Sequence, residues 1–156
     1  MTDTPGGMRS EAFEVSPRLG LVCIDDGDRR TGAAAGIEEL GYRVHVATSA
    51  DDAAERIRKN SYEVVVVDQA FQGASPHDNP LLTKIQSLPM AARRSMFVTL
   101  LGAELKTFDA MIAFTKSVNL VVSYKDIAQL RAILQRAVAD NDQFYQVFRR
   151  VLAEKR

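Results

Sequence analysis

Two short apolar runs, each followed directly by aspartate, most limit how this chain can fold. Leu19–Ile24 precedes Asp25 and Asp26, and Val64–Val67 precedes Asp68. Runs of this length without internal charge are typical of strands buried on both faces of a parallel sheet. If the two strands lie side by side in the same direction, their aspartates meet at the carboxyl edge of the sheet. Open α/β folds build their sites at that edge.

The rest of the chain alternates segments typical of strands with segments typical of helices. The strand-like segments span residues 19–24, 42–47, 62–67, 96–101 and 120–123. Helix-like segments span residues 32–40, 50–59 and 107–117, and two more begin at Pro80 and Asp126. Alternating strand–helix units predict an α/β fold, a doubly wound parallel sheet of five strands.

Capping signals mark several of these boundaries. Ser49, followed three residues later by Asp52, is typical of a helix N-terminus. Asn79 before Pro80 predicts another helix start. Gly41 predicts a helix end, because glycine tolerates the left-handed conformation found there.

The predicted elements divide the 156 residues into three regions. Residues 1–17 are rich in small and charged residues and are predicted to be a disordered tail. Residues 18–138 carry the α/β domain, and residues 139–156 form a C-terminal helical extension.

Net charge, the length of the apolar runs and cysteine content indicate which partners and which cellular location to expect. Lys plus Arg and Asp plus Glu number 20 each, so the formal net charge is zero and we expect no nucleic-acid partner. The longest apolar runs have the length of strands, so we expect no membrane span. Cys23 is the only cysteine, which excludes a disulfide within one chain and favours a cytoplasmic location.

Three carboxylates at one sheet edge would repel one another unless a hard cation lay between them. Mg²⁺ prefers such oxygen ligands, so Asp25, Asp26 and Asp68 predict a magnesium site. The alternative is that these residues are helix caps or loop acids, because aspartate is favoured at both positions.

The pattern resembles the receiver domain of bacterial two-component response regulators. The resemblance covers residues 18–138 and is carried by Ile24-Asp25-Asp26, by Val64–Val67 followed by Asp68, and by Leu40-Gly41-Tyr42-Arg43-Val44. It implies a flavodoxin-like fold in which Asp68 accepts a phosphoryl group from a histidine kinase. By the same resemblance, Asp25, Asp26 and Asp68 hold Mg²⁺ and the carbonyl group of Ala70 completes the coordination.

The sequence departs from that family at two positions that contact phosphate. Receivers have Thr or Ser after the fourth strand, where this chain has Gly102; Thr99 would substitute only if the strand ended three residues earlier. Tyr124 stands where receivers have Lys. Lys125 follows, but adjacent residues of a strand face opposite ways, so it reaches the site only if the loop is distorted.

Apolar residues recur every three or four positions along the C-terminal region. The stripe comprises Ile127, Leu130, Leu134, Ala137, Phe144, Phe148 and Val151, with the polar Asn141 at one position of the same spacing. It predicts an extended helix, which Asn141-Asp142 could divide in two. This helix either folds back on the domain or serves as a homodimer or docking surface.

Two functional hypotheses follow. In the first, a stand-alone receiver-like domain is phosphorylated at Asp68 with Mg²⁺ and signals through contacts with a histidine kinase or another signalling protein. In the second, a degenerate receiver binds proteins without phosphorylation, as Gly102 and Tyr124 suggest. A third reading, metal-assisted phosphate hydrolysis, lacks an evident general base, so we expect no enzyme.

Overall fold

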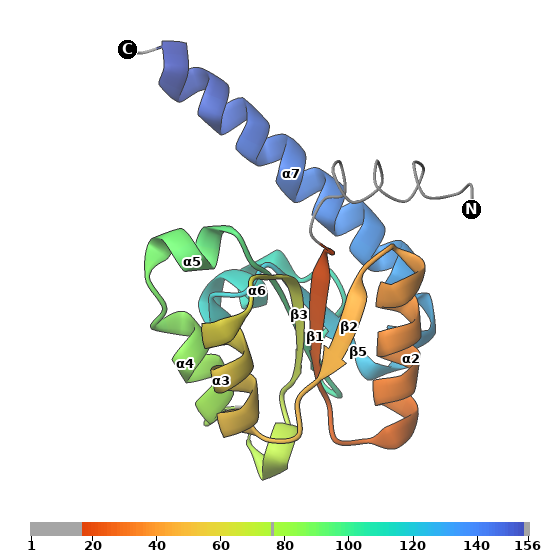
Figure 1. Ribbon diagram of the computed structural model, residues 1–156. Coiled ribbons are helices and arrows are strands. Elements are labelled where there is room, and N and C mark those ends of the chain that lie inside the picture. Colours follow the sequence, from red (N-terminus) through yellow and green to blue (C-terminus); the bar gives the residue numbers. More distant parts are fainter. Residues whose placement is uncertain (1–16, 76, 155–156) are drawn as a thin grey trace, which may run out of the picture.

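The computed structural model describes residues 17–75 and 77–154 (Figure 1). All of the predicted tail except Pro17 lies outside these residues. The core is one sheet of five parallel strands in the order β2-β1-β3-β4-β5. The strands are β1 Leu19–Cys23, β2 Arg43–Val46, β3 Tyr62–Asp68, β4 Phe97–Gly102 and β5 Leu120–Ser123. The predicted fold class is confirmed.

Helices cover both faces of the sheet (Figure 1). They are α2 Gly27–Glu39, α3 Ala50–Lys59, α4 Pro80–Gln86, α5 Met90–Arg94, α6 Ala110–Lys116 and α7 Leu130–Glu154, with 3-10 turns η1 Phe71–Gly73 and η2 Tyr124–Gln129. Within the described residues, no helix is long and apolar enough to cross a membrane.

The unbroken valine run of β3 results from burial on both faces. Val65 and Val67 belong to the apolar layer beneath α3, α4 and α6. Val64 and Val66 belong to the opposite layer, which includes Leu130 and other residues of α2 and α7. Because every valine of β3 contacts apolar side chains, apolar and polar residues do not alternate along this strand, as expected for a central parallel strand.

The predicted caps are confirmed. The Ser49 side chain accepts a hydrogen bond from the Asp52 amide at the start of α3, and that of Asn79 accepts one from the Leu82 amide at the start of α4. Gly41 has a φ of 100°, the left-handed conformation that favours glycine after a helix.

Other boundaries differ from the prediction. Helix α2 begins at Gly27, five residues early, because the Asp26 side chain caps it. Helix α6 begins at Ala110, three residues later than predicted, because the Asp109 side chain caps it. The 3-10 turn η2 precedes α7, and the five-residue α5 was not predicted.

Helix α7 runs for 25 residues and continues through Asn141-Asp142, where the sequence had left a division into two helices open. Its first part packs on the sheet, with Leu130 and Leu134 fully buried. At Gly36 of α2, a β-carbon would lie 3.4 Å from the backbone nitrogen of Arg131, so the missing side chain lets the two helices approach closely. The rest of α7 extends past the sheet (Figure 1).

Truncation of Leu134 tests how α7 is anchored. We expect Leu134→Ala to lower the free energy of unfolding by about 2–5 kcal/mol, because it leaves a cavity in the layer beneath α7. Gln143→Ala, at an exposed position of the same helix, should change it by less than about 0.5 kcal/mol. Urea denaturation measures both, and equal losses would contradict this anchoring.

Candidate functional site

The sheet topology brings the predicted aspartates to one edge. Strands β1 and β3 are parallel neighbours, with Cys23 opposite Val67. Asp25 and Asp26 therefore leave the sheet beside Asp68, at the carboxyl ends of these strands. The side chains that meet there form the candidate site.

Asp68 is the buried centre of this site, with only 2% of its surface exposed. Its Oδ1 atom accepts hydrogen bonds from the Tyr124 hydroxyl at 2.5 Å and from the Ala70 amide at 2.9 Å. Its Oδ2 atom lies 3.7 Å from Nε of Arg29. Burial of a carboxylate is costly unless such donors and a counter-charge replace the lost hydration.

Arg29 supplies that counter-charge from the first turn of α2. Its guanidinium carbon lies 3.8 Å from the ring centroid of Tyr124, a cation–π contact. Its Nη1 atom lies 4.0 Å from Oδ2 of Asp26, and its backbone amide donates to that same oxygen. One guanidinium thus lies between two of the three aspartates that were predicted to bind metal.

Asp25 is held by the loop that follows β3. Gln72 donates to Oδ2 of Asp25 through its backbone amide at 2.6 Å, and to Oδ1 through its side-chain amide at 2.9 Å. Gln72 has a φ of 58°, which turns its backbone toward the carboxylate. Both oxygens of Asp25 are therefore engaged in a loop contact.

Ala70 contributes its amide to the site. That amide donates to Asp68, while the Ala70 carbonyl accepts from the Gly73 amide at 3.0 Å. The carbonyl predicted to bind metal thus takes part in the turn after β3.

These contacts test whether the residues fit Mg²⁺. Arg29 lies beside Asp26 and Asp68, and Asp25 is bonded to Gln72. In the described ranges, no three side chains of Asp, Glu, His or Cys are grouped so that they could hold a metal ion. The arrangement does not fit magnesium, and Asp26 has the helix-cap role that was the alternative for these acids.

Gly102 and Tyr124, the two positions at which the sequence departs from receivers, have different surroundings in the structure. Gly102 ends β4, and the side-chain amide of Gln69 fills the space that a β-carbon would take there. Tyr124 turns toward Asp68 from the start of η2. Lys125 is exposed, and the ion pair described at Asp68 comes from Arg29 instead.

The environment of Tyr124 shifts its ionisation. Burial raises the pKa of its hydroxyl from 10.0 to about 12, aided by the hydrogen bond to Asp68 and by the negative charge of that carboxylate. Arg29 opposes this shift. Tyr124 therefore stays a neutral donor at physiological pH.

Sequence reasoning missed Arg29 and Gln72. Arg29 stands in a polar stretch, Gly27-Asp28-Arg29-Arg30, that was not assigned to a helix. A signal was available: Asp26 is a good cap, and a cation in the next turn is unfavourable there without another partner. Gln72 gave no comparable signal, because its role depends on the loop conformation.

Comparisons with known proteins identify the fold. The receiver domain of sensor histidine kinase PA1611 from Pseudomonas aeruginosa, which has magnesium in its active-site cleft, matches with a TM-score of 0.61 and 20% identity, over 80% of this chain and 99% of that one. Chemotaxis response regulator CheY4 of Vibrio cholerae matches with a TM-score of 0.62 and 14% identity, over 78% and 99%. This chain has the receiver fold.

Another receiver domain, from Methylobacillus flagellatus, matches with a TM-score of 0.58 and 20% identity, over 78% of this chain and 99% of that one. No protein-family model matches the sequence, and no curated protein matches it significantly. The receiver fold is thus shared with proteins whose sequences are far from this one.

Tyr124→Phe tests the contact with Asp68. Because folding raises the pKa of Tyr124 from 10.0 to about 12, its contribution to stability is complete below pH 10 and is lost as pH rises toward 12. The free energy of unfolding of the wild type should therefore fall more steeply over that range than that of Tyr124→Phe. Tyr42 and Tyr62, whose pKa values are also raised, are common to both proteins. Parallel curves from urea denaturation at each pH would contradict the contact.

Removal of the Arg29 guanidinium tests its role as counter-charge. We expect Arg29→Ala to bind Mg²⁺ more tightly than the wild type, because Asp26 and Asp68 would lose their internal cation. The control is Arg30→Ala, since Arg30 contacts only backbone carbonyls in this region. Amide chemical shifts during a Mg²⁺ titration measure binding. Equal or tighter binding by the wild type would contradict the role of Arg29 as counter-charge.

Proposed function

We propose that this protein is a receiver-fold signalling domain that acts through protein contacts without phosphorylation of Asp68. The observation that carries the proposal is the engagement of that carboxylate by Tyr124, by the Ala70 amide and by Arg29. The receiver fold of its structural neighbours supports a signalling role.

The chemistry of phosphoryl transfer supports this choice. An attacking carboxylate must approach the phosphorus atom while a cation neutralises the phosphoryl oxygens. Here Oδ1 of Asp68 accepts two hydrogen bonds and Oδ2 faces a guanidinium. Gly102 provides no hydroxyl, and Lys125 is exposed. Phosphorylation would require Tyr124 and Arg29 to move aside and new phosphate contacts to form.

Phosphorylation of Asp68 with Mg²⁺ is the second candidate. The position of Asp68 at the carboxyl end of β3, beside Asp25 and Asp26, favours it, as does the magnesium in the PA1611 receiver domain. In that case the partner would be a histidine kinase.

The proposal includes a cytoplasmic, non-enzymatic role with another signalling protein as partner, rather than nucleic acid or a membrane. Equal numbers of acidic and basic residues support the exclusion of nucleic acid. It also includes the division into a receiver-like domain, residues 18–138, and an extension, residues 139–156, that offers a contact surface.

Incubation with acetyl phosphate and Mg²⁺ distinguishes the two candidates. We expect intact-mass measurement to show no Asp68-dependent adduct, because Tyr124 and the Ala70 amide bond Oδ1 of that carboxylate and the guanidinium of Arg29 lies beside Oδ2. Beryllium fluoride, which imitates a phosphoryl group, should likewise leave the amide spectrum unchanged.

Asp68→Asn is the matched control for these measurements. It keeps the size of the side chain and one acceptor oxygen while removing the charged, nucleophilic carboxylate. An adduct that forms on the wild type and is lost in Asp68→Asn would overturn the proposal and establish the second candidate.

A further inference from the structure

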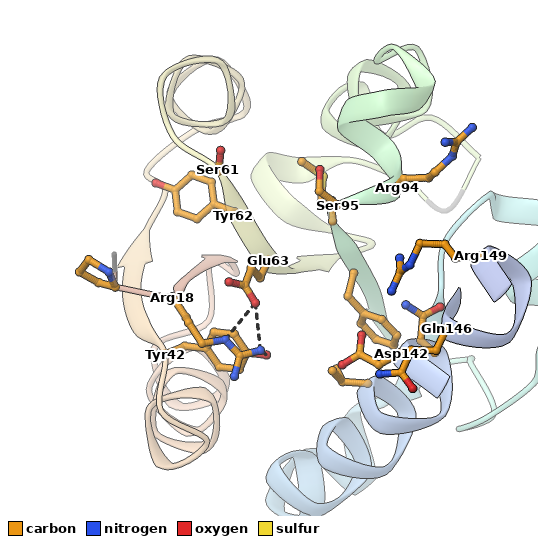
Figure 2. Close-up of a pocket in the computed structure, with 15 residues that line it drawn as sticks. Arg18, Tyr42, Ser61, Tyr62, Glu63, Arg94, Ser95, Asp142, Gln146 and Arg149 are labelled. Carbon is orange, nitrogen blue, oxygen red and sulfur yellow. Dashed lines mark hydrogen bonds and ion pairs between the residues drawn. The ribbon is translucent and has the colours of Figure 1, made fainter. Parts of the chain in front are cut away.

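A groove of about 600 Å³ lies at the amino ends of β1, β3 and β4, opposite the edge that carries Asp68. The buried side chains of Met96 and Phe97 line it where β4 begins. Figure 2 shows the ion pair of Arg18 and Glu63 on one wall and residues of α7 on the opposite wall. This groove is therefore separate from the candidate site at the carboxyl edge.

The groove continues into a second groove of about 310 Å³, which runs between α3 and α5. The two share four lining residues, Ser61, Tyr62, Ser95 and Met96. Together they form the amino-edge groove, which extends from α7 through these four residues to α3 and α5.

The amino-edge groove is open to solvent. Eight of the fifteen residues that line its larger part are exposed. A small molecule there would remain largely in water, whereas binding pockets for small molecules bury most of the ligand surface. An elongated, open groove fits an extended segment of polypeptide instead.

Several polar side chains of the groove are available to bind such a segment. Within residues 17–75 and 77–154, four of them have no hydrogen-bond or ion-pair partner, namely Arg94, Asn141, Gln146 and Arg149. The two amide side chains can donate to and accept from the peptide groups of a bound segment. The two guanidiniums can bind carboxylates through paired hydrogen bonds.

The charge of the groove favours an acidic segment. Its cations are Arg18, Arg58, Lys59, Arg94 and Arg149. Its anions are Glu63 and Asp142, and Glu55 beside it pairs with both Arg58 and Lys59. Five cations and three anions leave an excess of two positive charges, in a chain whose formal net charge is zero. Electrostatic complementarity therefore selects a partner with carboxylates.

We propose that the amino-edge groove is a docking site for an extended acidic segment of a partner protein. Carboxylates of the segment bind Arg94 and Arg149, and its backbone forms hydrogen bonds with Asn141 and Gln146. Its apolar side chains contact Met96. The extension of α7 supplies one wall of the site, which gives the part of this helix beyond the sheet a role in binding.

This inference rests on the proposed function, to which it adds a place and a class of partner. Its test involves no residue of the carboxyl edge. Failure of peptide binding and failure of the phosphorylation experiment are therefore distinguishable.

Selection from a library of random peptides of about 12 residues tests the site, because an extended chain of that length spans roughly 40 Å. The library is first depleted on Ser61→Trp, a substitution at an exposed position that fills the junction of the two grooves. Depletion removes peptides that bind elsewhere. We expect the peptides then retained by the full-length wild type to carry a net negative charge. Circular dichroism verifies that the variant is folded.

The affinity of one retained peptide, measured by fluorescence anisotropy, tests the role of Arg149. We expect Arg149→Gln to weaken binding about tenfold, because a charge-assisted contact with a carboxylate is lost. The matched control is Arg150→Gln, at an exposed neighbour that does not line the groove, which should bind like the wild type.

An empty selection, retained peptides without an excess of acidic residues, or equal effects of the two arginine variants would overturn the proposal. The first 16 residues of the chain are a rival occupant, because they precede Pro17 of the groove wall and contain three acidic residues and one basic residue. Tighter peptide binding by a full-length variant with both Glu11→Gln and Glu14→Gln would assign the groove to that segment and likewise overturn the proposal.

Discussion

The buried carboxylate of Asp68 is the constraint on which the carboxyl edge of the sheet depends. Removing such a group from water costs several kcal/mol unless donors and a counter-charge replace the lost hydration. Tyr124, the Ala70 amide and Arg29 provide that replacement. Three separate segments, the turn after β3, the first turn of α2 and the start of η2, are therefore held together at one point.

This arrangement also links the sheet to the C-terminal helix. Tyr124 begins η2, and η2 leads directly into α7. The hydrogen bond from Tyr124 to Asp68 fixes the start of that segment, while Leu130 and Leu134 fix the next two turns in the apolar layer. The orientation of the extension thus depends on polar contacts at the edge of the sheet as well as on apolar packing.

Most of the fold could be predicted because its signals are local or periodic. The valine run of β3 and the caps at Ser49 and Asn79 depend on a few adjacent residues. Helix α5 could not be predicted, because five residues without a buried side chain leave no periodic pattern. The continuity of α7 through Asn141 could not be predicted either, since one polar residue at a half-buried position neither requires nor prevents a break.

The candidate site could be predicted only in part. The convergence of Asp25, Asp26 and Asp68 follows from strand order, and the importance of Tyr124 follows from its place after β5. The partners of these acids depend on how α2 begins and how the η1 loop turns. Repulsion among carboxylates indicated that a cation was required, but it could not distinguish a metal ion from a guanidinium.

A counter-charge that belongs to the chain has a consequence of its own. Arg29 is attached four residues from Asp25, so its effective concentration at the acids is set by the backbone and cannot be diluted. A chelator cannot remove it, and depletion of divalent ions leaves it in place. The presence of a cation at this edge is therefore decided during folding and does not depend on the concentration of divalent ions in solution.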